Sequence, residues 1–314
     1  MESQSDKKTK VTIMIPTYNQ ELYIGEAIES ALAQDYENLE IVVSNDCSTD
    51  NTERVILKYL SDDRIKYFKN KKNLGRVGNY HKTLYDYATG DWTVNLDGDD
   101  YYIDPHFVSR SMDAILCAGE EAVVFSISSI YARKSIEKKK IPCQEVKHNG
   151  LLLNGIDYFT SIRDIGDFNH YSLLYNRRKA MEIGFYTKDC LISDFHSGIR
   201  LAIHGSVIIL PYAVAKWRAH GKNATTTEFE GRIQKNREAF MDIADYACKY
   251  IDKDIINVWL NEAYKLVDIE FFQVKAYNVK SIKDLFGLVK MMKPKGIYLK
   301  TFCKSCIHYT YAKR

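Results

Sequence analysis

The stretch Trp92-Thr93-Val94-Asn95-Leu96-Asp97-Gly98-Asp99-Asp100 decides how this chain is interpreted, because an apolar run ends there in three carboxylates. Its first five residues are typical of a β-strand, and the preceding Thr89-Gly90-Asp91 is typical of a turn. Side chains at the carboxyl end of a strand in an α/β sheet face the crevice where ligands bind. Three carboxylates there repel one another unless a cation is present, and Mg²⁺ and Mn²⁺ prefer oxygen ligands. An acidic turn after an exposed strand is the alternative for the Asp-x-Asp pattern alone.

The composition is typical of a globular chain with a sizeable core. Of 314 residues, 46% are hydrophobic and 27% are charged, which fits one large domain or up to two ordinary ones. No apolar run approaches the roughly 18 residues of a membrane span, and the N-terminus is polar, so neither a signal peptide nor a membrane helix is expected. Seven irregularly spaced cysteines favour a reducing, cytoplasmic compartment. Cys303 and Cys306 form a lone CxxC, which does not favour a zinc site.

Charge is unevenly spread along the chain. Residues 280–314 carry nine Lys or Arg and one acid, Asp284, a net charge of +8 against +3 for the whole chain. The apolar stripe from Ile282 to Met292 is interleaved with lysines, as in a helix that lies on an anionic membrane surface. Packing of this stripe on the preceding domain is the alternative. Peripheral contact with the inner face of the cell membrane is therefore one of two expectations, and no nucleic-acid partner is expected.

Strand-like and helix-like segments alternate through the first two thirds of the chain. Apolar, β-prone runs occur at residues 11–15, 39–43, 65–68, 92–96, 122–127 and 207–210. Segments between them carry apolar residues at helical spacing, such as Ile24, Ile28 and Leu32. This order predicts an α/β fold with a mostly parallel central sheet. Residues 133–150, rich in Lys and Glu and without periodicity, are expected to form an exposed excursion.

Beyond residue 225 the pattern changes to amphipathic helices. Apolar positions mark one helix from Phe229 to Ala247 and another from Ile255 to Phe271. We therefore expect two parts, an α/β domain over residues 10–225 and a helical, basic C-terminal extension over residues 226–314.

Four motifs follow the predicted strands in a fixed order. They are Pro16-Thr17-Tyr18-Asn19, Asn45-Asp46-Cys47-Ser48-Thr49-Asp50-Asn51-Thr52, Asn73-Leu74-Gly75 and Asp97-Gly98-Asp99-Asp100. In this combination the chain resembles family 2 glycosyltransferases, nucleotide-sugar-dependent enzymes with the Rossmann-like GT-A fold. The resemblance covers about residues 10–225 and points to bacterial surface-polysaccharide biosynthesis.

The resemblance implies how the donor is bound. Pro16, Thr17 and Tyr18 match the loop that packs against the nucleotide base, although an ordinary turn would tolerate the same residues. Asp46 matches the acid that accepts a hydrogen bond from the base, a task that suits a carboxylate; helix capping is its alternative. In the segment that carries a cation toward the diphosphate, the family's Arg-Asn pair is replaced by His81-Lys82. Arg76 and Asn79 are the candidates here, with solvated surface as the alternative.

The resemblance also implies a divalent metal, Mn²⁺ or Mg²⁺. Asp97 matches the acid that faces the ribose and the metal, and Asp99 matches the direct metal ligand that bridges to the diphosphate. Asp100 is expected to support their loop. His220 matches a histidine that approaches the metal or the diphosphate in related enzymes, although a lone histidine is as often structural.

Asp194 is the candidate general base. It takes the place of the Asp in the family's Glu-Asp motif, six residues before Arg200, while Ser193 stands where Glu is common. In the family, this Asp takes the proton of the incoming hydroxyl group. An N-cap is the alternative, because an acid before an apolar helical run is ordinary.

These expectations combine into a metal-dependent, inverting glycosyltransferase. It would move a sugar, most simply from a UDP-sugar, to a hydroxyl group of a glycan or lipid-linked acceptor. A sugar nucleotidyltransferase of similar fold would need a Gly-rich loop after the first strand, and Pro16-Thr17-Tyr18-Asn19 has no glycine. An inactive nucleotide-sugar-binding protein is the other alternative, which the presence of Asp97, Asp99 and Asp194 together disfavours.

Overall fold

The computed structural model describes residues 9–166, 168–220, 229–277 and 290. The chain forms two compact units, residues 1–189 with 193–218, and residues 190–192 with 219–314. The domain boundary expected at residue 225 falls among residues that are not described and stays a prediction.

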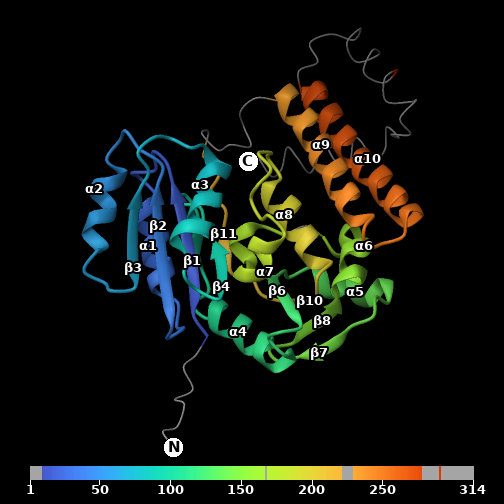
Figure 1. Cartoon of the computed structure of the whole chain (residues 1–314), viewed down its shortest axis with the longest axis horizontal. Helices are drawn as coiled ribbons and strands as arrows, with labels where there is room; N and C mark the ends of the chain where they lie inside the picture. The colour runs from blue at the N-terminus through green and yellow to red at the C-terminus, as the bar shows by residue number, and fades with distance from the viewer. Residues whose placement is uncertain (1–8, 167, 221–228, 278–289, 291–314) are drawn as a thin grey trace, which may run out of the picture. The chain divides into compact units, whose positions relative to one another are not determined.

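The first unit is built on a nine-stranded sheet (Figure 1). In spatial order its strands are β3 (Ile65–Lys69), β2 (Leu39–Asn45), β1 (Val11–Thr17), β4 (Trp92–Asn95), β9 (Leu173–Asn176), β6 (Val123–Ser128), β10 (Ser206–Leu210), β8 (Gly150–Asn154) and β7 (Gln144–Val146). Within this sheet β9 and β8 run against the direction of the others. The mostly parallel α/β sheet expected from the sequence is thus confirmed. A separate two-stranded ribbon pairs β5 (Tyr101–Tyr102) with β11 (Ala215–Lys216).

Helices cover both faces of this sheet. On one face, α1 (Ile24–Leu32) contacts β1 and β2, and α4 (Phe107–Ala118) contacts β6 and β10. Helical segments on the other face follow in chain order: α3 (Arg76–Lys82), the π-helical turn η2 (Thr83–Tyr87), α6 (Gly155–Ile165), α7 (Arg177–Glu182) and α8 (Ser193–Ala202). The remaining short segments are α2 (Thr52–Ile56), the 3₁₀ turns η1 (Leu57–Tyr59) and η3 (His170–Ser172), and α5 (Ala132–Lys139).

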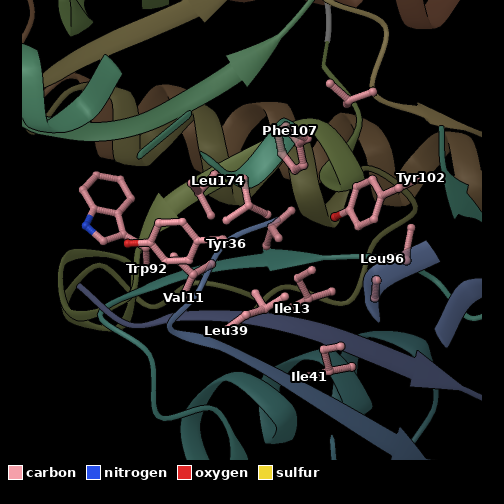
Figure 2. Packing of buried hydrophobic residues seen from close by; sticks show 14 of the residues in the cluster. Val11, Ile13, Tyr36, Leu39, Ile41, Trp92, Leu96, Tyr102, Phe107 and Leu174 are labelled. Carbon is pink, nitrogen blue, oxygen red and sulfur yellow. The ribbon is translucent and has the colours of Figure 1, made fainter. Parts of the chain in front are cut away.

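The main apolar core lies between the sheet and helices α1 and α4. Figure 2 shows Val11 and Ile13 of β1 beside Leu39 and Ile41 of β2, and Phe107 of α4 belongs to the same cluster. All seven residues of β1 are buried, as a central parallel strand requires. Burial of this apolar area stabilises the sheet by about 25 cal/mol per Å².

The strand ends determine where functional side chains gather. Strands β1, β2 and β4 are parallel, so their carboxyl ends lie at one edge of the sheet. Strand β9 pairs antiparallel with β4, with Trp92 opposite Asn176 and Thr93 opposite Tyr175. Because of this reversal, the residues just before β9 lie at the same edge as the residues just after β4.

Residues 133–150 differ from the expectation of an exposed excursion. Much of their surface is exposed, but they form most of α5 and all of edge strand β7, which extends the sheet beyond β8. The isolated apolar residues Ala132 and Ile136 are buried and hold α5 in place. Tertiary packing thus overrides a sequence that lacks periodicity.

The second unit contains two long helices, α9 (Phe229–Ala247) and α10 (Lys253–Tyr277), where amphipathic helices were expected (Figure 1). They pack against each other, with the rings of Phe240 and Trp259 6.0 Å apart and an ion pair between Arg237 and Asp268. The described helices include none that is long and apolar enough to cross a membrane. The stripe at 282–292, apart from Lys290, and the Cys303–Cys306 pair lie outside the described residues.

Candidate active site

Asp97 lies two residues after the end of β4 and is held by three neighbours. The hydroxyl group of Tyr80 donates to its carboxylate at 2.6 Å, and the side-chain amide of Asn95 donates at 3.1 Å. Nε2 of His170 lies 3.3 Å from its second oxygen. Burial alone would raise the pKa of Asp97, but His170 and Tyr80 outweigh it and hold this pKa at about 2. The carboxylate is therefore ionised at neutral pH.

His170 also faces Asp194, so that one ring lies between two acids. Its Nδ1 is 3.6 Å from Oδ2 of Asp194, which lies in the first turn of α8. Burial would lower the pKa of His170, but the charges of Asp97 and Asp194 raise it well above its usual range. Burial would likewise raise the pKa of Asp194, and the neighbouring His170 lowers it. The cluster thus combines two carboxylates with a cationic ring.

Sequence reasoning did not find His170. Only its position just before β9 distinguishes it, and the pairing of β9 with β4 brings it to Asp97. No local motif marks that pairing. The clue in the sequence is a histidine shortly before the short apolar run Leu173-Leu174-Tyr175, which is a weak signal.

Arg76 adds a second cation to this cluster. It is the first residue of α3, and its guanidinium carbon lies 5.4 Å from the centre of the Tyr80 ring. Burial would lower its pKa, but the Tyr80 hydroxyl group and the carboxylates of Asp97 and Asp194 raise it. The structure therefore brings three of the predicted site residues together, Arg76, Asp97 and Asp194.

Arg218 is the last residue of the first unit, and it holds the acidic loop that is formed by residues 97–100. Its backbone N–H donates to Oδ1 of Asp100 at 2.9 Å, and its Nε donates to the carbonyl oxygen of Asp99 at 3.0 Å. The guanidinium lies between the rings of Tyr23 and Tyr101, 5.1 and 5.0 Å from their centres. Burial and the charges of Asp97 and Asp99 raise the pKa of Asp100 to about 7. Asp100 thus ties the loop to Arg218, a supporting role.

The acidic loop suits a divalent cation by the chemistry of its donors. Among the described residues, no group of three or more His, Cys, Asp or Glu side chains is arranged to hold a metal ion. Mg²⁺ nevertheless often takes only one or two carboxylates, and substrate phosphates complete its shell. Asp97 and Asp99 fit that requirement. His220 belongs to the second unit, and its predicted part in the site stays a prediction.

Asp46 and Asn79 are buried under the loop that precedes α3, each 2% exposed. Both oxygens of Asp46 accept the backbone N–H of Leu74, at 2.9 and 3.0 Å, and one of them also accepts from Asn70. Asn79 is hydrogen-bonded to the side chain and the carbonyl oxygen of Ser44. In this arrangement both residues hold the loop against β2, and their direct contact with a nucleotide stays a prediction.

The end of β1 lies directly against the acidic loop. The N–H of Gly98 donates to the carbonyl oxygen of Pro16 at 3.2 Å, and a Cβ on Gly98 would lie 2.9 Å from the side chain of Thr17. Thr17 is buried, whereas Tyr18 is 45% exposed and therefore open to a ligand. Only glycine allows this close approach of the two loops.

A hollow of about 390 Å³ adjoins Arg76. It lies between the start of α3, at Gly75 and Arg76, and the segment Tyr186–Asp189, and its volume is that of a small-ligand pocket. Arg200, predicted on the same helix as Asp194, donates to the carbonyl oxygens of Ile183 and Gly184 just before that segment. Arg200 thus holds, from α8, the backbone that leads into this segment.

A sequence model of glycosyl transferase family 2 matches residues 12–184. A relative from Escherichia coli, named UDP-Glc:alpha-D-GlcNAc-diphosphoundecaprenol beta-1,3-glucosyltransferase WfgD, is 32% identical over 163 residues. That alignment covers 52% of this chain and 63% of the relative, so less than two thirds of the relative's length is matched.

Solved structures share the fold. The structure of S. aureus TarS 1-349 in complex with UDP-GlcNAc superposes with a TM-score of 0.62 at 18% identity, covering 88% of this chain and 77% of that chain. The mannosyltransferase PcManGT from Pyrobaculum calidifontis, in complex with GDP-Man and Mn²⁺, gives a TM-score of 0.53 at 15% identity, covering 96% of this chain and 84% of that chain. Because the family match covers more than half of the chain, the protein belongs to glycosyl transferase family 2, and it has the GT-A fold.

Proposed function

We propose that this enzyme transfers a sugar from a UDP-sugar to a hydroxyl group of a lipid-linked or polymeric glycan, with inversion at the anomeric carbon. The observation that carries the proposal is the cluster in which Asp97 and Asp194 face the same His170 ring beside Arg76. The name of the E. coli relative, which specifies UDP-Glc and a diphosphoundecaprenol-linked acceptor, supports the substrate classes.

On the donor side, Arg76 lies beside Tyr80, interacts with the charge of Asp97 and would face the diphosphate. Tyr18, with Pro16 and Thr17 behind it, would contact the base, and Asp46 would support it either directly or through the loop at Leu74. Asp99, Asp97 and His220 would hold Mn²⁺ or Mg²⁺. When bound, such an ion stabilises the charge that develops on the leaving diphosphate.

On the acceptor side, Asp194 is ionised at neutral pH and can accept a proton. It would take the proton of the acceptor hydroxyl group as that oxygen attacks the anomeric carbon from the face opposite the diphosphate. General-base help of this kind contributes about 10²- to 10⁴-fold to the rate. Attack opposite the leaving group inverts the anomeric centre, and no covalent intermediate is needed.

The place of action that we propose is the inner face of the cell membrane. The +8 charge of residues 280–314 would attract an anionic leaflet and bring a lipid-linked acceptor to the enzyme.

The experiment is a measurement of UDP release from UDP-glucose and UDP-GlcNAc, with GDP-mannose as the control donor. Each donor is tested with and without an undecaprenyl-diphosphate-linked sugar, in Mn²⁺ and in EDTA. We expect the acceptor to stimulate release of UDP from a UDP-sugar, and we expect EDTA to abolish this release. Tight UDP binding without UDP release from any donor would instead support the alternative of an inactive nucleotide-sugar-binding protein. UDP release that EDTA does not affect would contradict the proposed dependence on a metal ion.

A further inference from the structure

His170 joins the two halves of the proposed active site. Its Nε2 is 3.3 Å from Asp97, which follows β4, and its Nδ1 is 3.6 Å from Asp194, which lies in the first turn of α8. The two acids come from segments that share no strand or helix. The imidazole ring contacts both acids, one with each of its nitrogens.

The ring itself is held firmly in place. His170 begins η3, directly before β9, and β9 is paired on both sides, with β4 and with β6. The ring meets the ring of Tyr80 edge-on, 6.0 Å between centres at 71°, and that of Tyr171 at 6.0 Å and 89°. Its side chain is only 14% exposed. Its position is therefore determined by the central sheet and by aromatic packing.

We propose that His170 is a positioning residue that fixes the carboxylate of Asp194 relative to Asp97. This inference rests on the proposed function, in which Asp97 faces the donor and Asp194 the acceptor. A base can assist the attack only if its oxygen reaches the acceptor proton while the donor is held in line, and small displacements cost large factors in rate. His170 acts through the two acids and need not touch either substrate.

A purely structural histidine would behave differently. It would lower the melting temperature when replaced, and its effect on turnover would not depend on whether residue 194 can accept a proton. A positioning residue acts through Asp194, so its replacement should matter little once Asp194 is already disabled. Such coupling between neighbouring residues is what a double-mutant cycle measures.

The experiment uses the full chain and the variants His170→Gln and His170→Asn, each alone and combined with Asp194→Asn. Glutamine and asparagine can donate N–H groups from a single nitrogen, whereas the imidazole ring has a nitrogen on each of two sides. Neither variant can therefore face Asp97 and Asp194 with two separate nitrogens as His170 does. We measure kcat of UDP-sugar transfer, UDP affinity by calorimetry and the melting temperature. The matched control is His106→Gln, because His106 also pairs with an aspartate, Asp35 at 2.5 Å, but on the surface.

We expect His170→Gln to lower kcat about tenfold or more, and by less than about threefold when Asp194→Asn is present. UDP affinity should change less than kcat, and His106→Gln should leave kcat unchanged. The inference would be overturned if His170→Gln lowered kcat equally with and without Asp194→Asn, or if it left kcat at the wild-type value. Failure of both His170 variants to fold would also overturn it. If the wild-type chain transfers no sugar, the proposed function itself is wrong. This outcome is distinct from failure of the positioning role, in which the wild-type chain is active and the His170 variants show no coupling to residue 194.

Discussion

The backbone N–H of Arg218 donates to the carboxylate of Asp100 at 2.9 Å, although the two residues are 118 positions apart. The side chain of Arg218 adds a hydrogen bond to the carbonyl oxygen of Asp99 and an ion pair with Glu26. A single arginine therefore ties the acidic loop to α1 and to the end of the first unit. These contacts hold the loop that is proposed to receive the metal.

Arg218→Lys should loosen this loop. Lysine keeps the charge but loses the planar group that lies between two tyrosine rings and donates from Nε. We expect a loss of about 1–3 kcal/mol in the free energy of unfolding, together with a higher Mn²⁺ concentration for half-maximal transfer. Urea denaturation and a Mn²⁺ titration measure both effects. The surface control Arg133→Lys should change stability by less than about 0.5 kcal/mol, and an equal change in both variants would refute the supporting role.

Asp99→Asn should abolish metal-dependent transfer while the fold is retained. The amide keeps the size of the side chain and removes the negative charge that Mn²⁺ or Mg²⁺ requires. Turnover and melting temperature are measured on the same preparation, with Asp113→Asn on exposed α4 surface as the control. Near-normal turnover in a folded Asp99→Asn protein would contradict the assignment.

Glu40 gives a prediction about stability and pH. This carboxylate is 5% exposed and accepts hydrogen bonds from Thr12, Lys10 and Thr89. Burial alone would raise its pKa, but these hydrogen bonds lower the pKa below the ordinary 4.5. Because the folded-state pKa is depressed, Glu40 stabilises the fold above about pH 4.5, and this contribution is lost as the pH falls through the folded-state value.

Glu40→Gln should therefore destabilise the protein at pH 7 by about 1–3 kcal/mol, and the difference from wild type should shrink toward pH 3. Urea denaturation at several pH values measures this difference, with exposed Glu137→Gln as the control. A difference that is constant with pH would show that the charge of Glu40 does not contribute.

The basic C-terminal segment gives a prediction about location. At about 1 kcal/mol per basic residue near an anionic leaflet, a few of the lysines in residues 280–314 suffice for reversible attachment. The full chain should float with vesicles that contain anionic lipid at low salt and should be released at high salt, because salt screens these charges. Equal binding to neutral and anionic vesicles, or binding to neither, would leave this segment as a solvated surface.

Most of the sheet could be predicted from the sequence because its parallel strands are continuous apolar runs. Strand β9 could not, since its four residues, Leu173–Asn176, are too few to show a period and its partners are distant in sequence. Strand β7 could not be predicted from the sequence for a different reason. Two of its three residues, Gln144 and Glu145, are polar, and only pairing with β8 makes the segment a strand.

Some residues of the candidate site could likewise be predicted from local motifs, whereas others depend on contacts between distant segments. Asp97 and Asp194 belong to motifs that follow a strand or begin a helix, and the structure brings them to one cluster with Arg76. His170 depends on the pairing of β9 with β4, which no local pattern encodes. Asp46 illustrates a further limit, because a motif identifies the residue but not the loop N–H groups that its oxygens accept.

The most direct test of the account is kcat of the Asp194→Asn enzyme. Asparagine keeps the size and shape of the side chain in the first turn of α8, so the substitution removes the base and retains the helix. We predict that kcat of UDP-sugar transfer falls about 10²- to 10⁴-fold while UDP affinity and the melting temperature barely change. Wild-type kcat in a folded Asp194→Asn enzyme would contradict the central claim that Asp194 takes the acceptor proton.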